Sequence, residues 1–154
     1  MGVYLNPGNV DFQEVLNSKI YVDKSELIQY TNSVLRTTQK YICVSRPRRF
    51  GKSMAANMLT AYYSRGCDSR EMFQGLKIAK HTGFEEHLNQ YNVIHLNMRD
   101  YLTESENMKQ LIQFVEEDLL DELQQEFADL RMPRRRTLVK VLEQAFAQYK
   151  IPFV

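Results

Sequence analysis

The sequence predicts an α/β fold, a three-layer α/β/α sandwich in which helices cover a mostly parallel sheet. Short apolar runs typical of strands occur at residues 40–45 and 92–98, and a third begins at residue 151. Segments with helical periodicity separate these runs. Strands that alternate with helices pair in parallel and carry the helices on the faces of the sheet, so this order predicts the sandwich.

The first part of the chain predicts two helices, one on each side of the first strand. Residues 26–35 predict the first helix, and either Asp23 or Ser25 is suited to cap it. The strand that follows contains Cys43, which we expect to be a small buried residue. A loop and then a second helix, expected over 51–64, come directly after that strand.

The second part of the chain predicts four further helices. Two short ones are expected at 69–73 and 84–88, a long one at about 105–130, and a last one at about 136–148. Apolar residues recur at helical spacing in the long helix and predict its buried stripe. These residues are Met108, Leu111, Ile112, Val115, Leu119, Leu123 and Phe127. No internal repeat is visible, and the 154 residues suit a single domain.

The loop after the first strand reads Ser-Arg-Pro-Arg-Arg-Phe-Gly-Lys-Ser over positions 45–53. Strand, loop ending in Gly-Lys-Ser, and helix is the context of a phosphate-binding loop, although the first glycine of the full pattern is replaced by Arg46. Lys52 is expected to reach the β- and γ-phosphates of ATP, and the Ser53 hydroxyl to ligate Mg²⁺. The predicted nucleotide-binding residues are Arg46, Pro47, Arg48, Arg49, Phe50, Gly51, Lys52, Ser53 and Met54.

Other interpretations of these loop residues stay open. The arginines also fit a basic surface turn that contacts nucleic acid. Arg48 and Arg49 suit either a triphosphate or a structural pairing with an acidic residue behind the loop. Phe50 is expected to pack under the loop rather than to stack on adenine.

Charge is unevenly distributed along the second half of the chain. The long helix is rich in Asp and Glu, and the cluster Arg131, Arg134, Arg135 and Arg136 follows it at once. An acidic solvated face with basic residues at the helix C-terminus accounts for this pattern. Contact of the arginine cluster with nucleic acid, or with a neighbouring subunit's nucleotide, accounts for it as well.

Three stretches of the sequence resemble the predicted AAA-ATPase-like family of bacterial P-loop NTPases. They are Tyr4-Leu5-Asn6-Pro7-Gly8-Asn9, Ile20-Tyr21-Val22-Asp23-Lys24-Ser25, and the run from Val44 to Ser53. The likeness covers the whole chain in the family's usual order, and family members tolerate an arginine at the position of Arg46. The resemblance implies a P-loop NTPase sandwich that binds Mg-ATP.

The resemblance also implies that the last strand continues into an acidic motif that holds Mg²⁺ and activates water. That motif does not occur in residues 1–154. We therefore expect a single domain, truncated and incomplete at its C-terminal end, that binds ATP without efficient hydrolysis. We also expect bare strand edges, which favour pairing with another copy or with the missing C-terminal part.

Composition agrees with a globular domain. The hydrophobic fraction of 44% is sufficient for a core, and the net charge of +1 gives no general attraction to nucleic acid or membranes. Two cysteines suggest no disulfide framework, and no segment has the length of a membrane span, so we expect a cytoplasmic protein without membrane contact. The sequence leaves two other functions open. One is a nucleic-acid-binding or scaffold fragment that uses the loop arginines and the Arg131–Arg136 cluster. The other is a small-molecule kinase, which needs an acidic residue on a later strand that is not visible here.

Overall fold

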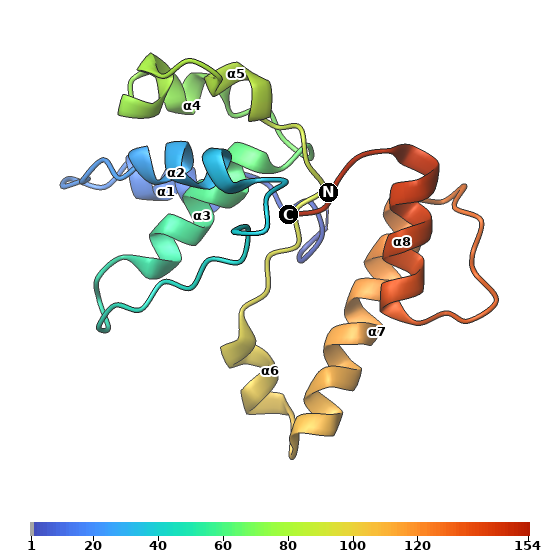
Figure 1. Cartoon of the computed structure of the whole chain (residues 1–154). Coiled ribbons are helices and arrows are strands. Elements are labelled where there is room, and N and C mark those ends of the chain that lie inside the picture. Colours follow the sequence, from blue (N-terminus) through green and yellow to red (C-terminus); the bar gives the residue numbers. More distant parts are fainter. Residues whose placement is uncertain (1) are drawn as a thin grey trace.

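A computed structural model describes residues 2–154, and its architecture is helical (Figure 1). The helices of the first half are α1 (Val10–Leu16), α2 (Glu26–Val34), α3 (Lys52–Tyr63), α4 (Arg70–Gln74), the 3₁₀ helix η1 (Lys77–Lys80) and α5 (Phe84–His87). The helices of the second half are α6 (Met98–Glu104), α7 (Met108–Glu126) and α8 (Leu138–Tyr149). Helices α1 to α5 gather in one body, while α7 and α8 form an arm on the other side of the molecule (Figure 1).

The predicted α/β sandwich is wrong. Within residues 2–154, helix accounts for 52% of the residues and strand for only 4%, without a sheet, and these proportions do not fit an α/β class. Residues 2–154 contain isolated bridges in place of strands, which pair Leu5 with Ile94, Ser64 with Tyr91, and Asn92 with Phe153. A single bridge satisfies few backbone groups, so these pairings do not extend into ladders.

The segment predicted as the first strand, residues 40–45, shows why the structure differs from the predicted sandwich. Residues 40–45 are extended, but no bridge pairs them with another segment of the described chain. Their side chains lie in solvent, with Tyr41 85% exposed, and Cys43 is exposed rather than buried as predicted. A hollow of about 380 Å³ lies between residues 40 and 42, α3 and residues 93–96. An apolar run predicts a strand only if a neighbour pairs with it, and this segment has none.

Residues 92–95 are the point where distant segments of the chain meet. The Asn6 N–H donates to the Val93 carbonyl at 2.8 Å on one side. On the other side the Asn92 N–H donates to the Pro152 carbonyl, and the Val154 N–H donates back to the Asn92 carbonyl. The amide group of Asn6 also bonds to the side chain of Asn92 and accepts from the Val93 N–H. This buried junction joins the helical body to the α7–α8 arm.

An aromatic core fills the body formed by α1 to α5. The rings of Phe12 and Phe73 stack with centroids 5.2 Å apart, and Tyr62 meets Phe73 edge-on at 5.5 Å. Tyr62, Phe12 and Phe73 are fully buried, so they exclude water from the centre of this body. Large aromatic side chains contribute most of the burial energy of a small core.

Hydrogen bonds from α2 fix the orientation of the second half of α3. Tyr62 donates its hydroxyl to the Phe84 carbonyl at 2.7 Å and accepts from the Asn32 amide at 3.1 Å. Tyr63 donates to the Asn32 carbonyl oxygen at 2.6 Å and also bonds to Thr31. Burial raises the pKa of Tyr62 to about 12, against the opposing effect of the Asn32 hydrogen bond, and burial also raises the pKa of Tyr63.

The α7–α8 arm is held by a second apolar cluster and by one carboxylate. Leu123 and Val141 are buried between the two helices with Leu5. Glu122 accepts the consecutive N–H groups of Val3, Tyr4 and Leu5, with the shortest bond 2.6 Å long, and so ties residues 3–5 to α7. Of the predicted stripe, Leu111, Leu119, Leu123 and Phe127 are buried, Val115 is half-buried, and Met108 and Ile112 are exposed. Within residues 2–154, no helix is both long and apolar enough to span a membrane.

Candidate functional site

Backbone N–H groups at the start of α3, directly after the loop, have no hydrogen-bond partner among the described residues. Gly51 caps α3 in the left-handed region, at φ 74°, and its carbonyl accepts the first helical bond from the Ala55 N–H at 3.0 Å. No hydrogen bond of the described residues uses the N–H groups of Lys52, Ser53 or Met54. Arg49 is also left-handed, at φ 68°, which is costly for a residue with a side chain.

The side chain of Lys52 folds back and bonds to the loop that precedes it. Its ammonium donates to the carbonyl oxygens of Arg46 at 2.6 Å and Pro47 at 3.0 Å. The ammonium therefore lies over the loop carbonyls, while the Lys52 side chain as a whole is exposed. Ser53 is exposed at the next position of α3, so its hydroxyl is accessible.

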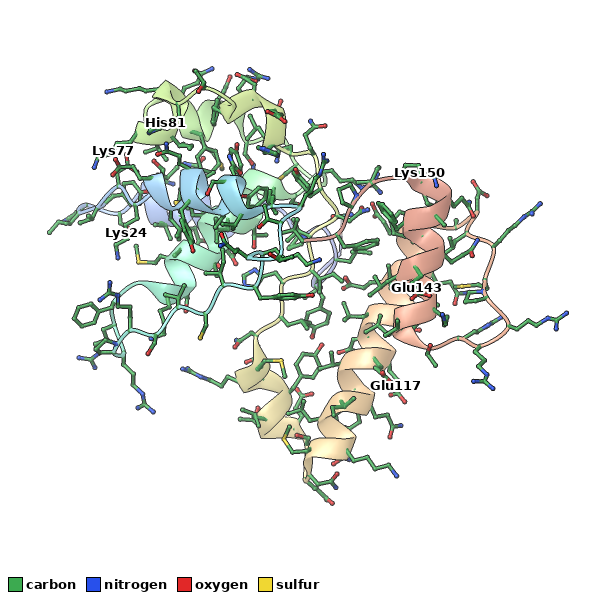
Figure 2. All side chains as sticks on the ribbon, in the orientation of Figure 1. Lys24, Lys77, His81, Glu117, Glu143 and Lys150 are labelled. Carbon is green, nitrogen blue, oxygen red and sulfur yellow. The ribbon has the colours of Figure 1, made fainter. Side chains whose placement is uncertain are left out.

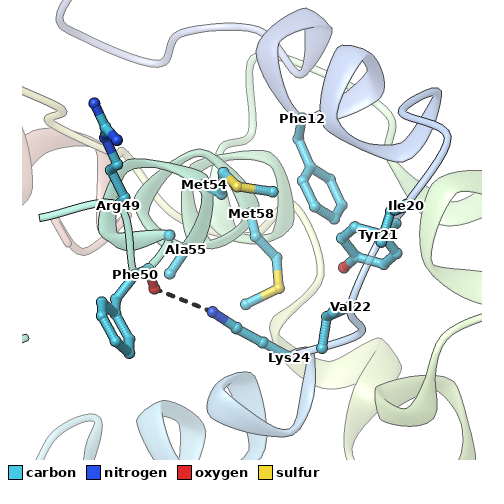
Figure 3. A pocket seen from close by; sticks show the side chains of 11 residues that line it. Phe12, Ile20, Tyr21, Val22, Lys24, Arg49, Phe50, Met54, Ala55 and Met58 are labelled. Carbon is cyan, nitrogen blue, oxygen red and sulfur yellow. Dashed lines mark hydrogen bonds between the residues drawn. The ribbon is translucent and has the colours of Figure 1, made fainter.

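A second lysine, Lys24, fixes the segment before α2 against the loop. Its ammonium donates to the Phe50 carbonyl at 3.1 Å (Figure 3). Lys24 projects from the body formed by α1 to α5, whereas Glu117 and Glu143 lie on the α7–α8 arm (Figure 2). This contact brings residues 21–24 beside the first turn of α3.

Asp23 holds the same segment from the opposite direction. Its carboxylate accepts the Ser25 N–H and the Lys77 N–H, each at 2.8 Å, and the Ser25 hydroxyl accepts the Ile78 N–H. Burial opposes ionisation of Asp23, but hydrogen bonds from Ser25 and Lys77 outweigh it and lower its pKa. Neither side chain caps α2 directly, in contrast to the prediction, because both are used to join α2 to η1.

The remaining loop residues are placed differently from one another. Arg49 and Phe50 line a cavity beside the loop together with Gly51 and Met54. Arg48 is exposed, and no ion pair of residues 2–154 involves it or Arg49. Phe50 is 60% exposed, so the prediction that it packs under the loop is wrong.

The two basic regions do not come together. The connection between α7 and α8, which contains the exposed residues Arg134, Arg135 and Arg136, lies on the opposite side of the molecule from the loop (Figure 1). A ligand that touched the loop arginines would not reach this cluster without spanning the whole molecule.

The cavity beside the loop includes residues to which the sequence analysis gave no role. Tyr21, Val22 and Lys24 come from the segment before α2, and Phe12 comes from α1. The available signal was the stretch Ile20–Ser25, which carries part of the family resemblance. Its role at the site depends on tertiary contacts that no local pattern encodes.

These features define a helical domain in which a glycine-lysine-serine loop leads into the N-terminus of α3. The sequence profile of the family described as predicted AAA-ATPase matches residues 7–154, and the chain belongs to this family. No curated protein and no solved structure matches the chain.

Proposed function

We propose that this protein binds the phosphates of ATP, with Mg²⁺, through the loop from Arg46 to Met54. The observation that carries the proposal is the set of unused amides at Lys52, Ser53 and Met54 behind a left-handed Gly51. Free N–H groups at a helix N-terminus attract anions, since the helix dipole adds partial positive charge there. Backbone strain such as that at Arg49 is concentrated at binding sites in proteins, which agrees with a ligand at this loop.

The side chains of the loop supply the rest of the proposed site. The ammonium of Lys52 is already held over the loop by two carbonyls, so a phosphate would exchange with them at short range. The Ser53 hydroxyl would supply one ligand to Mg²⁺. No three His, Cys, Asp or Glu side chains of residues 2–154 are grouped to hold a metal ion, so phosphate oxygens and water would complete the shell.

The proposal concerns binding and not hydrolysis. Phosphoryl transfer also needs a group that positions the attacking water. Asp23, the carboxylate on the segment beside the loop, is already bonded to the N–H groups of Ser25 and Lys77. Membership of a family described as predicted AAA-ATPase supports a nucleotide as the ligand.

Calorimetric titration with Mg-ATP tests the proposal. Replacing Lys52 with Ala should weaken binding by about tenfold or more, because a charge-assisted hydrogen bond contributes about 1.5–3 kcal/mol. Lys40→Ala is the matched control, since Lys40 is exposed before the loop and contacts the ring of Tyr41. Equal affinity of the two variants for ATP would reject the loop as the site.

A separate titration with an oligonucleotide tests nucleic acid as the alternative ligand. Binding of a DNA or RNA oligonucleotide with a steep salt dependence, unaffected by ATP, would favour contacts through the exposed arginines. The separation of the loop from the Arg131–Arg136 cluster counts against one short oligonucleotide that uses both (Figure 1).

A further inference from the structure

Large apolar side chains are exposed on the hairpin that α6 and α7 form at one end of the molecule (Figure 1). Met98 and Leu102 of α6, and Met108 and Ile112 of α7, are between 43% and 64% exposed. The two residues of each pair are four positions apart, which places them on one face of their helix. We refer to these four residues as the hairpin surface. Exposed apolar residues that gather on neighbouring elements are typical of protein contact sites.

Contacts on the inner side of the hairpin hold its two helices in place. Tyr101 of α6 is buried, and its hydroxyl donates to the Asp118 carboxylate of α7 at 2.8 Å. The ring of Tyr101 also lies 5.6 Å from the ring of Tyr4. The Asn107 side chain caps α7 by accepting the Gln110 N–H at 3.0 Å. The hairpin surface is therefore formed before any partner binds, which lowers the entropy lost on association.

The charge on the same two helices determines which partner can cover the hairpin surface. Residues 98–117 contain five acidic and two basic side chains. The exposed carboxylates include Asp100, Glu104, Glu106 and Glu116, and no ion pair of the described residues involves them. A like-charged partner would be repelled here, so the partner must carry basic side chains next to apolar ones.

The connection between α7 and α8 has this combination of side chains. Residues 131–140 contain five basic side chains and no acidic one. Arg131, Arg134, Arg135 and Arg136 are exposed, as is the neighbouring apolar residue Val139, and none of these arginines forms an ion pair within residues 2–154. The connection lies on the side of α7 opposite to α6 (Figure 1). The two complementary surfaces are therefore apart within one copy of the chain.

We propose that the hairpin surface of one copy binds the α7–α8 connection of a second copy. Val139 and the aliphatic stems of the arginines cover the hairpin surface, while the guanidinium groups pair with the carboxylates of α6 and α7. Each copy offers two different surfaces, so the contact is heterologous and repeats from copy to copy into a ring or a filament. The loop before α3 takes no part in this contact, so self-association and nucleotide binding are independent properties of the chain.

Sedimentation velocity of the full chain without nucleotide tests the contact. Complexes that grow with protein concentration should form at about 50 mM NaCl and dissociate at about 500 mM, because salt screens exposed charge pairs. Replacing Arg135 and Arg136 together with Gln should weaken association by about tenfold. The matched control replaces Lys19 and Lys80 with Gln, which removes the same charge from exposed positions outside the α7–α8 arm and should leave association unchanged.

A mixture of two variants tests the heterologous geometry. Replacing Glu104 and Glu106 together with Gln should also weaken association by about tenfold, since it removes charge from the other surface. In an equal mixture, the variant with Gln at positions 135 and 136 keeps its hairpin surface, and the variant with Gln at 104 and 106 keeps its connection. The mixture should therefore form a dimer and nothing larger.

Several results would overturn this contact. One is a wild-type protein that stays monomeric at both salt concentrations up to its limit of solubility. Another is association that the lysine control weakens as much as the arginine variant does. Complexes that form only after an oligonucleotide is added would assign the arginines to nucleic acid instead. All the replaced side chains are exposed, so each variant should fold like wild type, and circular dichroism checks this.

Discussion

The two ends of α3 differ in how far their polar groups are satisfied. Its last turns carry Tyr62 and Tyr63, which are buried and hydrogen-bonded in the aromatic core. Its first turn and the loop before it expose Lys52, Ser53 and Met54, and leave their amides unused. A ligand loop needs unsatisfied groups, which cost stability, and the packed end of the same helix offsets that cost. The predictions below break or sharpen this contrast between the two ends.

The largest effect is expected from a matched pair of aromatic truncations. Phe73→Ala removes a fully buried ring that contacts Phe12 and Tyr62, and should lower the free energy of unfolding by about 3–5 kcal/mol. Phe50→Ala removes an exposed ring from the loop and should change it by about 0.5 kcal/mol or less. Urea denaturation followed by circular dichroism measures both. Similar losses in the two variants would show that the loop is packed as tightly as the core.

A second, smaller effect concerns the carboxylate that ties residues 3–5 to α7. Glu122→Gln removes the charge that accepts three consecutive N–H groups, so we expect a loss of about 1–3 kcal/mol in urea denaturation. Glu117→Gln is the control on the same helix, since Glu117 is exposed and bonds only to Gln113 in the described contacts. A larger loss for Glu117→Gln than for Glu122→Gln would contradict the role given to Glu122.

Two glycine replacements test the strain in the loop. Gly51→Ala forces a side chain into the left-handed region at φ 74° and should cost about 1–2 kcal/mol of stability. Its new Cβ would be 3.0 Å from the flexible end of Lys24, which can move, so the backbone accounts for most of the cost. Gly75→Ala lies in open space at φ −85° and should be neutral or slightly stabilising. Thermal unfolding of both variants checks this, and equal melting temperatures would count against the left-handed cap.

A further effect appears only at high pH. Because burial raises the pKa of Tyr62 from its ordinary value of 10.0 to about 12, the neutral hydroxyl stabilises the fold fully below pH 10. This contribution is lost as the pH rises from about 10 to about 12. The free energy of unfolding, measured by urea denaturation across this interval, should fall less steeply for Tyr62→Phe than for wild type. Parallel profiles would mean that Tyr62 ionises equally well in the folded and unfolded chains.

Helix positions were predictable from the sequence, and the pairing of strands was not. Helix α3 was expected over 51–64 and is found at Lys52–Tyr63, because its boundaries depend on Gly51 and on nearby residues. The run at 40–45 has the same apolar character as a buried strand, yet it lies in solvent because no neighbouring segment pairs with it. Strand formation depends on partners that are distant in sequence, which a local pattern does not identify.

The same distinction between local features and long-range contacts applies to the candidate site. The glycine, lysine and serine of the loop follow from a short motif, and the resemblance to the family rested on it. The contact of Lys24 with Phe50 and the cavity around Tyr21 arise only when α1, α2 and α3 pack together. A motif therefore indicated the loop, while the cavity beside it depends on tertiary structure.

The junction at residues 92–95 has a consequence for the speed of folding. The Val93 N–H bonds to Asn6, 87 positions earlier, and the Asn92 amide bonds to Ile151, 59 positions later. Contacts of such high sequence separation lower folding rates, because the chain loses much entropy before they form. We expect the α7–α8 hairpin to form early. The hydrogen bonds of Asn6 and Asn92 should form last, in the rate-limiting step of folding.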